Sequence, residues 1–308
     1  MNAEPVIADR VSTDRVVTLG LVQMRPAGSP AETLEVAAGR IAEAAGAGAQ
    51  VVALPELFQS PYFCQRPDDE SAFGFAEPLP GPTTERLAAL AGEHGIVLVG
   101  GSIFERTAEG RYFNTTPVFG PAGDLLGTYR KTHIPEDILY HEQHYFAPGD
   151  TGVRVFDTPF GRLCPLICYD QWYPEAARLA TLAGAEILIY PTAIGVIDDE
   201  VEENITGDWE RMWRNVMVGH AAANNVFVAA INRVGREDAI TFWGGSFVAD
   251  PSSEVIALAG DEEGIVLARC DLARVRALQD AWRFLPNRRP DAYGGLVGAA
   301  GAPAGAIK

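Results

Sequence analysis

Short apolar runs alternate with helical patterns along most of the chain. Residues 16–24 form a β-rich apolar run, and residues 29–32 then supply an N-cap serine, a proline at the first helical position and a capping glutamate. Apolar residues keep helical spacing up to the glycines at 46–48, and a second apolar run, 51–54, follows. This order predicts a strand–helix–strand unit.

The same pattern recurs further along the chain, separated by two hairpin signals at 117–127 and 247–256. Two α/β halves, each with a mixed sheet covered by helices on one outer face, are expected to pack sheet to sheet. The pattern therefore predicts a four-layer αββα sandwich. The remaining predicted helices are 84–94, 174–183 and 209–223, and the remaining predicted strands are 96–99, 187–190 and 226–231.

The two ends of the chain differ from the middle. Residues 1–14 are polar, and residues 294–308 form a Gly/Ala/Pro-rich segment with little to bury. Both segments are expected to be mobile tails. No low-complexity linker divides residues 15–293, which are expected to form the folded domain.

Charge and cysteine content narrow the class of protein. The formal net charge of -17 argues against a nucleic-acid partner, which depends on clustered Lys and Arg. Four cysteines in 308 residues are too few for a disulfide framework, so reduced thiols are expected. Because neither a signal peptide nor a membrane-spanning run is evident, we expect a cytoplasmic protein with no membrane partner.

Cys168 ends an apolar run and is followed by a helix that begins at Pro174. A strand-to-helix elbow of this kind exposes a side chain, offers backbone N–H groups to an oxyanion and can lower a thiol pKa. Cysteine statistics alone favour the other interpretation, a buried structural thiol. Cys164, on the same strand and face, is expected in the core, and a packing role is also favoured for Cys64 over lining a pocket.

Two further residues could complete a thiol hydrolase. Glu56 ends a buried strand, where desolvation would raise its pKa towards that of a general base, although a solvated glutamate at a strand end is equally compatible. Lys131 ends a hairpin strand and could place a cation beside the thiol, although Arg-Lys pairs are usually at the surface. Together the three residues could supply a nucleophile, a base and an oxyanion donor.

Three blocks in the right order resemble the signature blocks of the nitrilase superfamily of carbon–nitrogen hydrolases: LPELF (54–58), YRKTH (129–133) and ICYDQWYPE (167–175). The resemblance extends over nearly the whole chain. It continues through 140–152, 185–195 and 288–293. It implies the αββα fold, no metal or organic cofactor, and homo-oligomers formed through helices near the nucleophile.

The resemblance also implies roles for individual residues. Cys168 would attack the substrate, Glu56 would be the general base, Lys131 would stabilise the oxyanion with the N–H of Tyr169, and Glu142 would orient the lysine and the substrate. The partner would be a small carbamoyl or amide compound. The substrate contacts implied are Tyr62, Tyr169, Trp172, Thr192 and Ala193.

Within the superfamily the chain most resembles N-carbamoylputrescine amidases, which share YFCQ (62–65) and the turn GDTG (149–152). Relatives that act on N-carbamoyl amino acids carry an arginine shortly after the nucleophile, where Gln171 and Trp172 stand here. The missing carboxylate clamp favours an amine-bearing or neutral substrate tail. Carboxylates in 196–206 could bind an ammonium, although a solvated acidic loop is the commoner case. A β-ureidopropionase-like hydrolase, an aliphatic amidase and a true nitrilase remain alternatives.

The sequence gives less support to three other classes of protein. His133, Asp137, His141 and His144 are close in sequence, but their spacing is loose for a metal-dependent hydrolase. A cysteine–histidine protease would need His220, which lies in a helical pattern and is better explained as a packed residue. A non-catalytic interaction module would be expected to have lost at least one of the three chemical groups.

Overall fold

The computed structural model describes residues 15–197 and 207–297. The first predicted unit is present: β1 (Val16–Gln23) leads into α1 (Pro30–Gly46), and β2 (Val51–Ala53) pairs parallel to β1. The predicted cap of α1 is confirmed, because the Ser29 hydroxyl accepts a hydrogen bond from the Glu32 N–H at 3.3 Å.

The first sheet runs in the order β18-β1-β2-β3-β5-β4, and β6 also pairs with β5. The neighbours β1, β2 and β3 are parallel, and the strands around them are antiparallel. The further elements of this half are α2 (Pro82–His94), β3 (Val97–Val99), β4 (Ile103–Arg106), β5 (Tyr112–Phe119), β6 (Leu125–Arg130) and β18 (Gly264–Asp271).

The second sheet repeats this plan in the order β17-β16-β13-β11-β10-β9, with β10, β11 and β13 parallel. Helices α4 (Pro174–Leu182) and α5 (Trp209–Asn224) accompany it. The strands are β9 (Phe156–Thr158), β10 (Gly161–Pro165), β11 (Ile187–Thr192), β13 (Phe227–Asn232), β16 (Phe247–Ala249) and β17 (Val255–Leu258).

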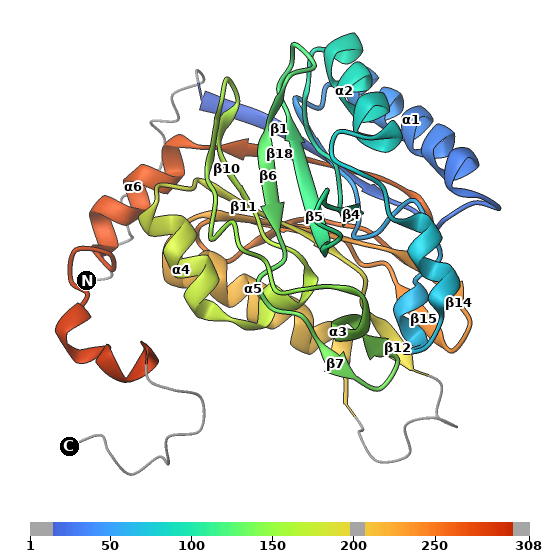
Figure 1. Cartoon of the computed structure of the whole chain (residues 1–308). Helices are drawn as coiled ribbons and strands as arrows, with labels where there is room; N and C mark the ends of the chain where they lie inside the picture. Colours follow the sequence, from blue (N-terminus) through green and yellow to red (C-terminus); the bar gives the residue numbers. More distant parts are fainter. Residues whose placement is uncertain (1–14, 198–206, 298–308) are drawn as a thin grey trace.

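Figure 1 shows the resulting layers: α1 and α2 cover one side, α4 and α5 cover the other, and the two sheets lie between them. Val17, Leu19 and Leu21 of β1 join a core cluster with residues of the second sheet, whereas Val22 joins a cluster with α1 and α2. Strands covered on both faces read as continuous apolar runs, which is why they were recognisable in the sequence. The predicted αββα sandwich is confirmed.

Smaller elements surround one end of the sheets. A short sheet contains β12 (Gly195–Ile197), β14 (Val234–Glu237) and β15 (Ile240–Trp243), and a hairpin pairs β7 (Glu136–Asp137) with β8 (Tyr140–His141). The short helix α3 (Glu142–Tyr145) follows the hairpin, and α6 (Ala273–Trp282) follows β18.

Several predictions concern residues outside this description. The predicted tail residues 1–14 and 298–308 and the acidic residues of 198–206 lie outside the described residues. Residues Gly294–Val297, predicted to be part of the C-terminal tail, form a short turn with exposed side chains. Within the described ranges, no helix has the length and apolar character needed to cross a membrane.

Candidate active site

The candidate residues gather at the carboxyl ends of the parallel strands. Glu56 follows β2, Cys168 follows β10, and Ala193 follows β11. Because the two sheets face each other, residues from both halves meet there (Figure 1). In open α/β sheets this is the edge where ligands bind.

The loop that carries Glu56 is held in a strained shape. Leu57 adopts a left-handed backbone with φ of 45°, and its N–H donates to the Ser102 hydroxyl at 3.0 Å. Gly101, with φ of +61°, lets the chain pass close by, since a Cβ there would come within 2.2 Å of the Pro55 carbonyl oxygen. The loop therefore depends on a glycine and a hydroxyl outside it.

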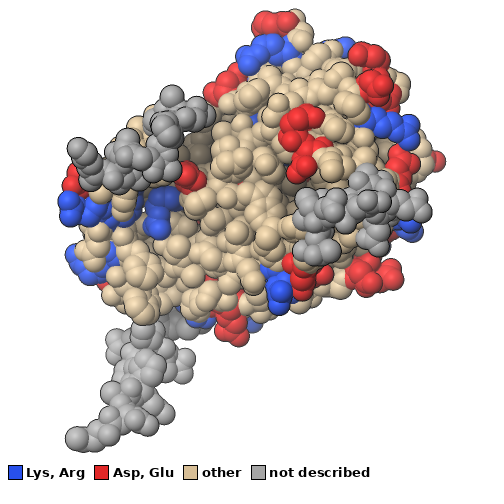
Figure 2. All heavy atoms as spheres, turned by 90° about the horizontal axis from the view of Figure 1, so that it is seen from below, with Lys and Arg blue, Asp and Glu red and all other residues tan. Residues whose placement is uncertain are grey.

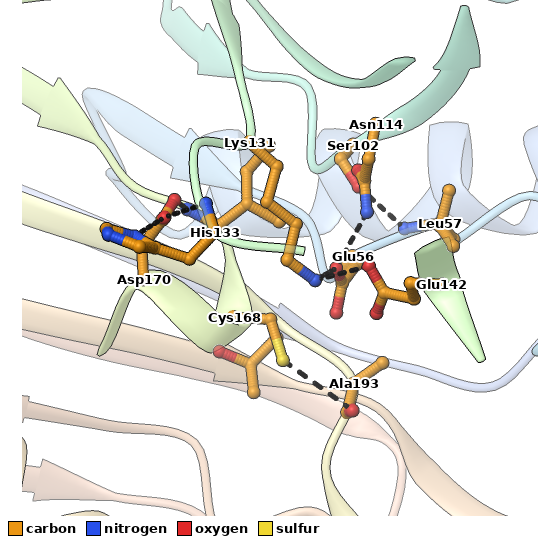
Figure 3. Close-up of polar contacts among 12 residues, drawn as sticks. Glu56, Leu57, Ser102, Asn114, Lys131, His133, Glu142, Cys168, Asp170 and Ala193 are labelled. Atoms are coloured by element: carbon orange, nitrogen blue, oxygen red, sulfur yellow. Dashed lines mark hydrogen bonds and ion pairs between the residues drawn. The ribbon is translucent and has the colours of Figure 1, made fainter. Parts of the chain in front are cut away.

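Lys131 lies between two carboxylates. Its Nζ donates to Glu56 Oε1 at 2.8 Å and to Glu142 Oε2 at 2.6 Å, and all three side chains are 0% exposed. Tyr62 donates its hydroxyl to the other oxygen of Glu142, Oε1, at 2.8 Å. Figure 3 shows the ammonium at the centre of this group, with Cys168 beside it.

Burial and charge shift the pKa values of this group. Burial opposes the charge of Lys131, but Glu142 and Glu56 outweigh it and raise the pKa of the lysine above its ordinary value. Burial raises the pKa of Glu142 to about 7, with Lys131 opposing and Glu56 adding to the rise. The lysine is therefore charged, and one carboxylate is close to protonation at neutral pH.

Cys168 sits at the predicted elbow. It opens a short 3₁₀ helix (Cys168–Trp172), with a left-handed φ of 37°, and α4 follows at Pro174. The thiol donates to the Ala193 carbonyl at 3.7 Å. Although such an elbow can lower a thiol pKa, here burial and then Glu56 raise the pKa of Cys168, and the nearby Lys131 only partly offsets them.

Two details of the sequence prediction need correction, both concerning where a strand ends. The strand β2 ends at Ala53, so Glu56 lies in the following loop; it is fully buried, which excludes the solvated alternative. Lys131 directly follows the hairpin strand β6 and is 0% exposed, so the surface position usual for Arg-Lys pairs does not apply to it. The strand β10 ends at Pro165, so Cys164 does not share a strand with Cys168, although it does lie in the core as predicted.

The residues implied as substrate contacts differ in position. The Tyr62 hydroxyl donates a hydrogen bond to Glu142, and the Ala193 carbonyl accepts one from the Cys168 thiol. The Thr192 hydroxyl donates to the Tyr190 carbonyl of its own strand at 3.0 Å. Tyr169 and Trp172 are partly exposed on the helix that begins at Cys168.

The histidines of the rival sites are engaged elsewhere. His133 Nδ1 lies 2.7 Å from Asp170, and His141 Nδ1 lies 2.7 Å from Glu136. No set of three or more His, Cys, Asp and Glu side chains in the described parts of the chain is arranged to hold a metal ion. His220 is packed, as predicted, with Nε2 2.8 Å from the Gln171 carbonyl.

Three buried polar residues next to the site were not singled out from the sequence. Asn114 Nδ2 donates to Glu56 Oε1 at 2.8 Å. Asp170 accepts from the backbone N–H groups of His133 and Ile167, and Arg233 donates to the carbonyls of the Glu56 loop. An asparagine inside a strand was the one local signal available, because strands disfavour that residue.

Comparison with known proteins agrees with this architecture. The family model described as carbon-nitrogen hydrolase matches residues 18–280. An N-carbamoylputrescine amidase from Solanum lycopersicum is 40% identical, over 91% of this chain and 94% of the relative. A citrullinase from Francisella tularensis is 37% identical, over 91% of this chain and 98% of the relative.

The fold has a solved counterpart as well. The crystal structure of a carbon-nitrogen hydrolase from Helicobacter pylori superposes with a TM-score of 0.85 at 37% identity, covering 92% of this chain and 99% of that one. Sequence, fold and site thus agree, and the chain belongs to the carbon–nitrogen hydrolases of the nitrilase superfamily.

Proposed function

We propose that this hydrolase cleaves N-carbamoylputrescine through a covalent intermediate on Cys168. The observation that carries the proposal is the buried group around the thiol, in which Lys131 bridges Glu56 and Glu142. An amide-type bond needs a nucleophile, a base and a donor for the oxyanion, and this group contains all three.

Glu56 is proposed as the general base. Both donors that reach its carboxylate bind Oε1, while Oε2 is buried and has no hydrogen-bond partner among the described residues. In Figure 3 the second oxygen lies on the side that faces Cys168 and Ala193. Because burial raises the pKa of the thiol, the attack begins with transfer of its proton to this oxygen.

Lys131 is proposed as the oxyanion donor. Its ammonium has three N–H bonds, and the two carboxylates use two of them. The third can reach an oxyanion on a carbon bonded to Cys168 Sγ, together with the backbone N–H of Tyr169. Glu142 orients the ammonium through its own hydrogen bond with the Lys131 Nζ, at 2.6 Å.

The reaction then proceeds in two balanced halves. Sγ bonds to the ureido carbon, and the C–N bond to the putrescine nitrogen breaks as Glu56 returns the proton to the leaving amine. Water, deprotonated by Glu56, next attacks the S-carbamoyl carbon, and the thiol leaves with the proton. The carbamic acid released decomposes to carbon dioxide and ammonia.

The substrate tail is inferred from the wall beside the nucleophile. Gln171 and Trp172 stand where the amino-acid hydrolases carry arginine. Gln171 is 0% exposed, and its Oε1 accepts the Trp213 indole N–H at 2.8 Å. This arrangement offers a substrate carboxylate no cation at that position. The similarity to N-carbamoylputrescine amidases supports the same choice, and the similarity to a citrullinase supplies the runner-up.

The first experiment compares two substrates that differ by one group. Citrulline carries the same ureido chain as N-carbamoylputrescine plus an α-carboxylate. Ammonia release is measured for both, with wild type, Cys168→Ala and the matched buried control Cys164→Ala, in the presence and absence of a chelator. We expect chelator-insensitive turnover that favours N-carbamoylputrescine at least tenfold, is lost in Cys168→Ala and persists in Cys164→Ala.

The other results are equally informative. Preference for citrulline, or for N-carbamoyl-β-alanine assayed as a third substrate, would overturn the substrate and keep the thiol mechanism. Turnover that survives in Cys168→Ala would overturn the nucleophile itself.

We also propose that the protein acts in the cytoplasm on a small molecule and has no nucleic-acid or membrane partner.

Self-association through α4 and α5 is proposed as well. Three apolar residues on these helices are exposed: Leu179 to 55%, Leu182 to 43% and Met212 to 43%. Figure 2, which views this side, shows a broad uncharged area with charged residues around it. Light scattering should report a dimer or larger assembly that Leu179→Glu dissociates, whereas Leu125→Glu, equally apolar and 43% exposed on β6, should not. A monomeric wild type would overturn this part.

A further inference from the structure

Asn114 lies at the contact between the first sheet and the candidate base. It is a fully buried residue of β5, and its Nδ2 donates to Glu56 Oε1 at 2.8 Å (Figure 3). Lys131 donates to the same oxygen at the same distance. Glu56 Oε1 is therefore bound by one neutral and one charged donor.

The two donors fix the orientation of the Glu56 carboxylate. With both on Oε1, the buried Oε2 is left without a partner in the part of the chain that the structure describes. Rotation of the carboxylate short of a half-turn, which would merely exchange its two equivalent oxygens, would break both hydrogen bonds and bury two unpaired donors, which is costly. A single donor would leave the carboxylate freer to turn.

A simple packing role does not explain this residue. Asparagine is disfavoured in strands, and its NH₂ group must be desolvated here at a cost that only a hydrogen bond recovers, while its amide oxygen has no partner among the described residues. Thr116, two residues along the same strand and on the same face, is also fully buried, and its hydroxyl has no partner in the described structure. Asn114 therefore differs from Thr116 in its side-chain hydrogen bond to Glu56.

We propose that Asn114 is a positioning residue that holds Oε1 of Glu56 and so leaves Oε2 as the oxygen that acts as the base. The inference rests on the proposed role of Glu56. A neutral donor to a carboxylate stabilises its charged form without adding a charge of its own. The remaining N–H of Lys131 can then donate a hydrogen bond to the substrate.

The test uses the reaction of Cys168 with iodoacetamide, which needs the thiol proton removed but needs no natural substrate. The rate is measured against pH by mass spectrometry of the intact protein, with peptide mapping to locate the label. Asn114→Leu removes the donor, and the nearly isosteric Asn114→Asp replaces it with a second carboxyl group that competes for the proton. Thr116→Val is the matched control, and Glu56→Gln defines the rate without the base.

For Asn114→Leu we expect the midpoint of the acid limb to move up by about one pH unit, so that the rate at a pH well below the wild-type midpoint falls about tenfold. Asn114→Asp should move the midpoint further in the same direction, because two adjacent carboxyl groups cannot both ionise easily. Thr116→Val should stay within about twofold of wild type. Circular dichroism and thermal melting identify any variant that has not folded, in which case the isosteric Asn114→Asp decides.

Wild-type midpoints and rates in both Asn114 variants would overturn the proposal, as would a Glu56→Gln variant that alkylates like wild type. A wrong substrate assignment would give a result different from both of these outcomes. In that case wild type would show the expected alkylation profile, including its dependence on Asn114, and yet release no ammonia from N-carbamoylputrescine.

Discussion

At the scale of single residues, the site is governed by the cost of buried charge. An ammonium and two carboxylates are all 0% exposed around Lys131. Unpaired, each would be strongly destabilising, whereas the bridge lets the lysine offset both acids. Burial is the main cause of the raised pKa of Glu142, and the second carboxylate, Glu56, adds to it, which makes the site sensitive to pH.

The rate is expected to fall as the pH drops through about 7. Burial raises the pKa of Glu142 to about 7, so below that pH the carboxylate gains a proton and loses its hold on Lys131. The folded chain then binds a proton that the unfolded chain does not, so this group favours folding more as the pH falls, while activity declines. A kcat/KM profile checks the limb, which should vanish from near pH 7 in Glu142→Gln. A limb unchanged in that variant would assign it to another group.

Glu56→Gln is expected to reduce kcat by about 10²- to 10⁴-fold, the range for loss of a general base. The amide can still accept from Lys131 through its oxygen, so the fold should keep its melting temperature. Its NH₂ group would point where the unpartnered Oε2 now lies and cannot take a proton. Steady-state rates and a thermal melt are the measurements. A variant with more than a tenth of the wild-type kcat would contradict the role of base.

At the scale of elements, Asp170 fastens the segment that follows β6 to the elbow at Cys168. One oxygen accepts the His133 backbone N–H at 3.0 Å, and the other accepts the Tyr129 hydroxyl at 2.6 Å and the Ile167 N–H at 2.9 Å. The carboxylate is fully buried, so it needs these donors. It thereby fixes the segment of the oxyanion donor relative to the nucleophile.

Asp170→Asn is expected to destabilise the fold by about 2 kcal/mol and to lower kcat. Its NH₂ group would face donors instead of accepting from them, so charged hydrogen bonds are lost and buried donors are left unpaired. Chemical denaturation gives the free energy of unfolding, and Asp261→Asn, at an exposed position, is the control for the substitution itself. Equal stability of the two variants would show that Asp170 does not join these elements.

How well the sequence predicts a feature depends on whether the signal for that feature is local. Helix starts such as Ser29 and buried strands such as β2 carry their signals locally, and they were predicted within one or two residues. Glu56, Lys131 and Cys168 were found because their local motifs are distinctive. The local pattern around Lys131 could not show that its side chain points into the interior, because this depends on the carboxylates of Glu56 and Glu142 from separate segments. Only the family resemblance implied the contact with Glu142.

At the scale of the whole molecule, Arg233 connects the two halves. It follows β13 of the second sheet, and its guanidinium donates to the Leu57 carbonyl at 2.9 Å and the Ser60 carbonyl at 2.8 Å in the first half. The bond to Leu57 joins residues 176 positions apart, so no local pattern could reveal it. Glu237 balances the buried charge with contacts of 2.7 and 2.8 Å.

Arg233→Met should destabilise the protein by about 3–5 kcal/mol, because it leaves Glu237 without its buried partner and the loop carbonyls without donors. Adding Glu237→Gln should recover part of this stability by removing the unpaired charge. Activity should stay low in the double variant, since the loop that carries Glu56 still lacks its anchor. Denaturation curves and kcat measured together on the three proteins separate the two effects. If the double variant regained both stability and kcat, Arg233 would serve only to neutralise Glu237, and the base would not depend on contact between the halves.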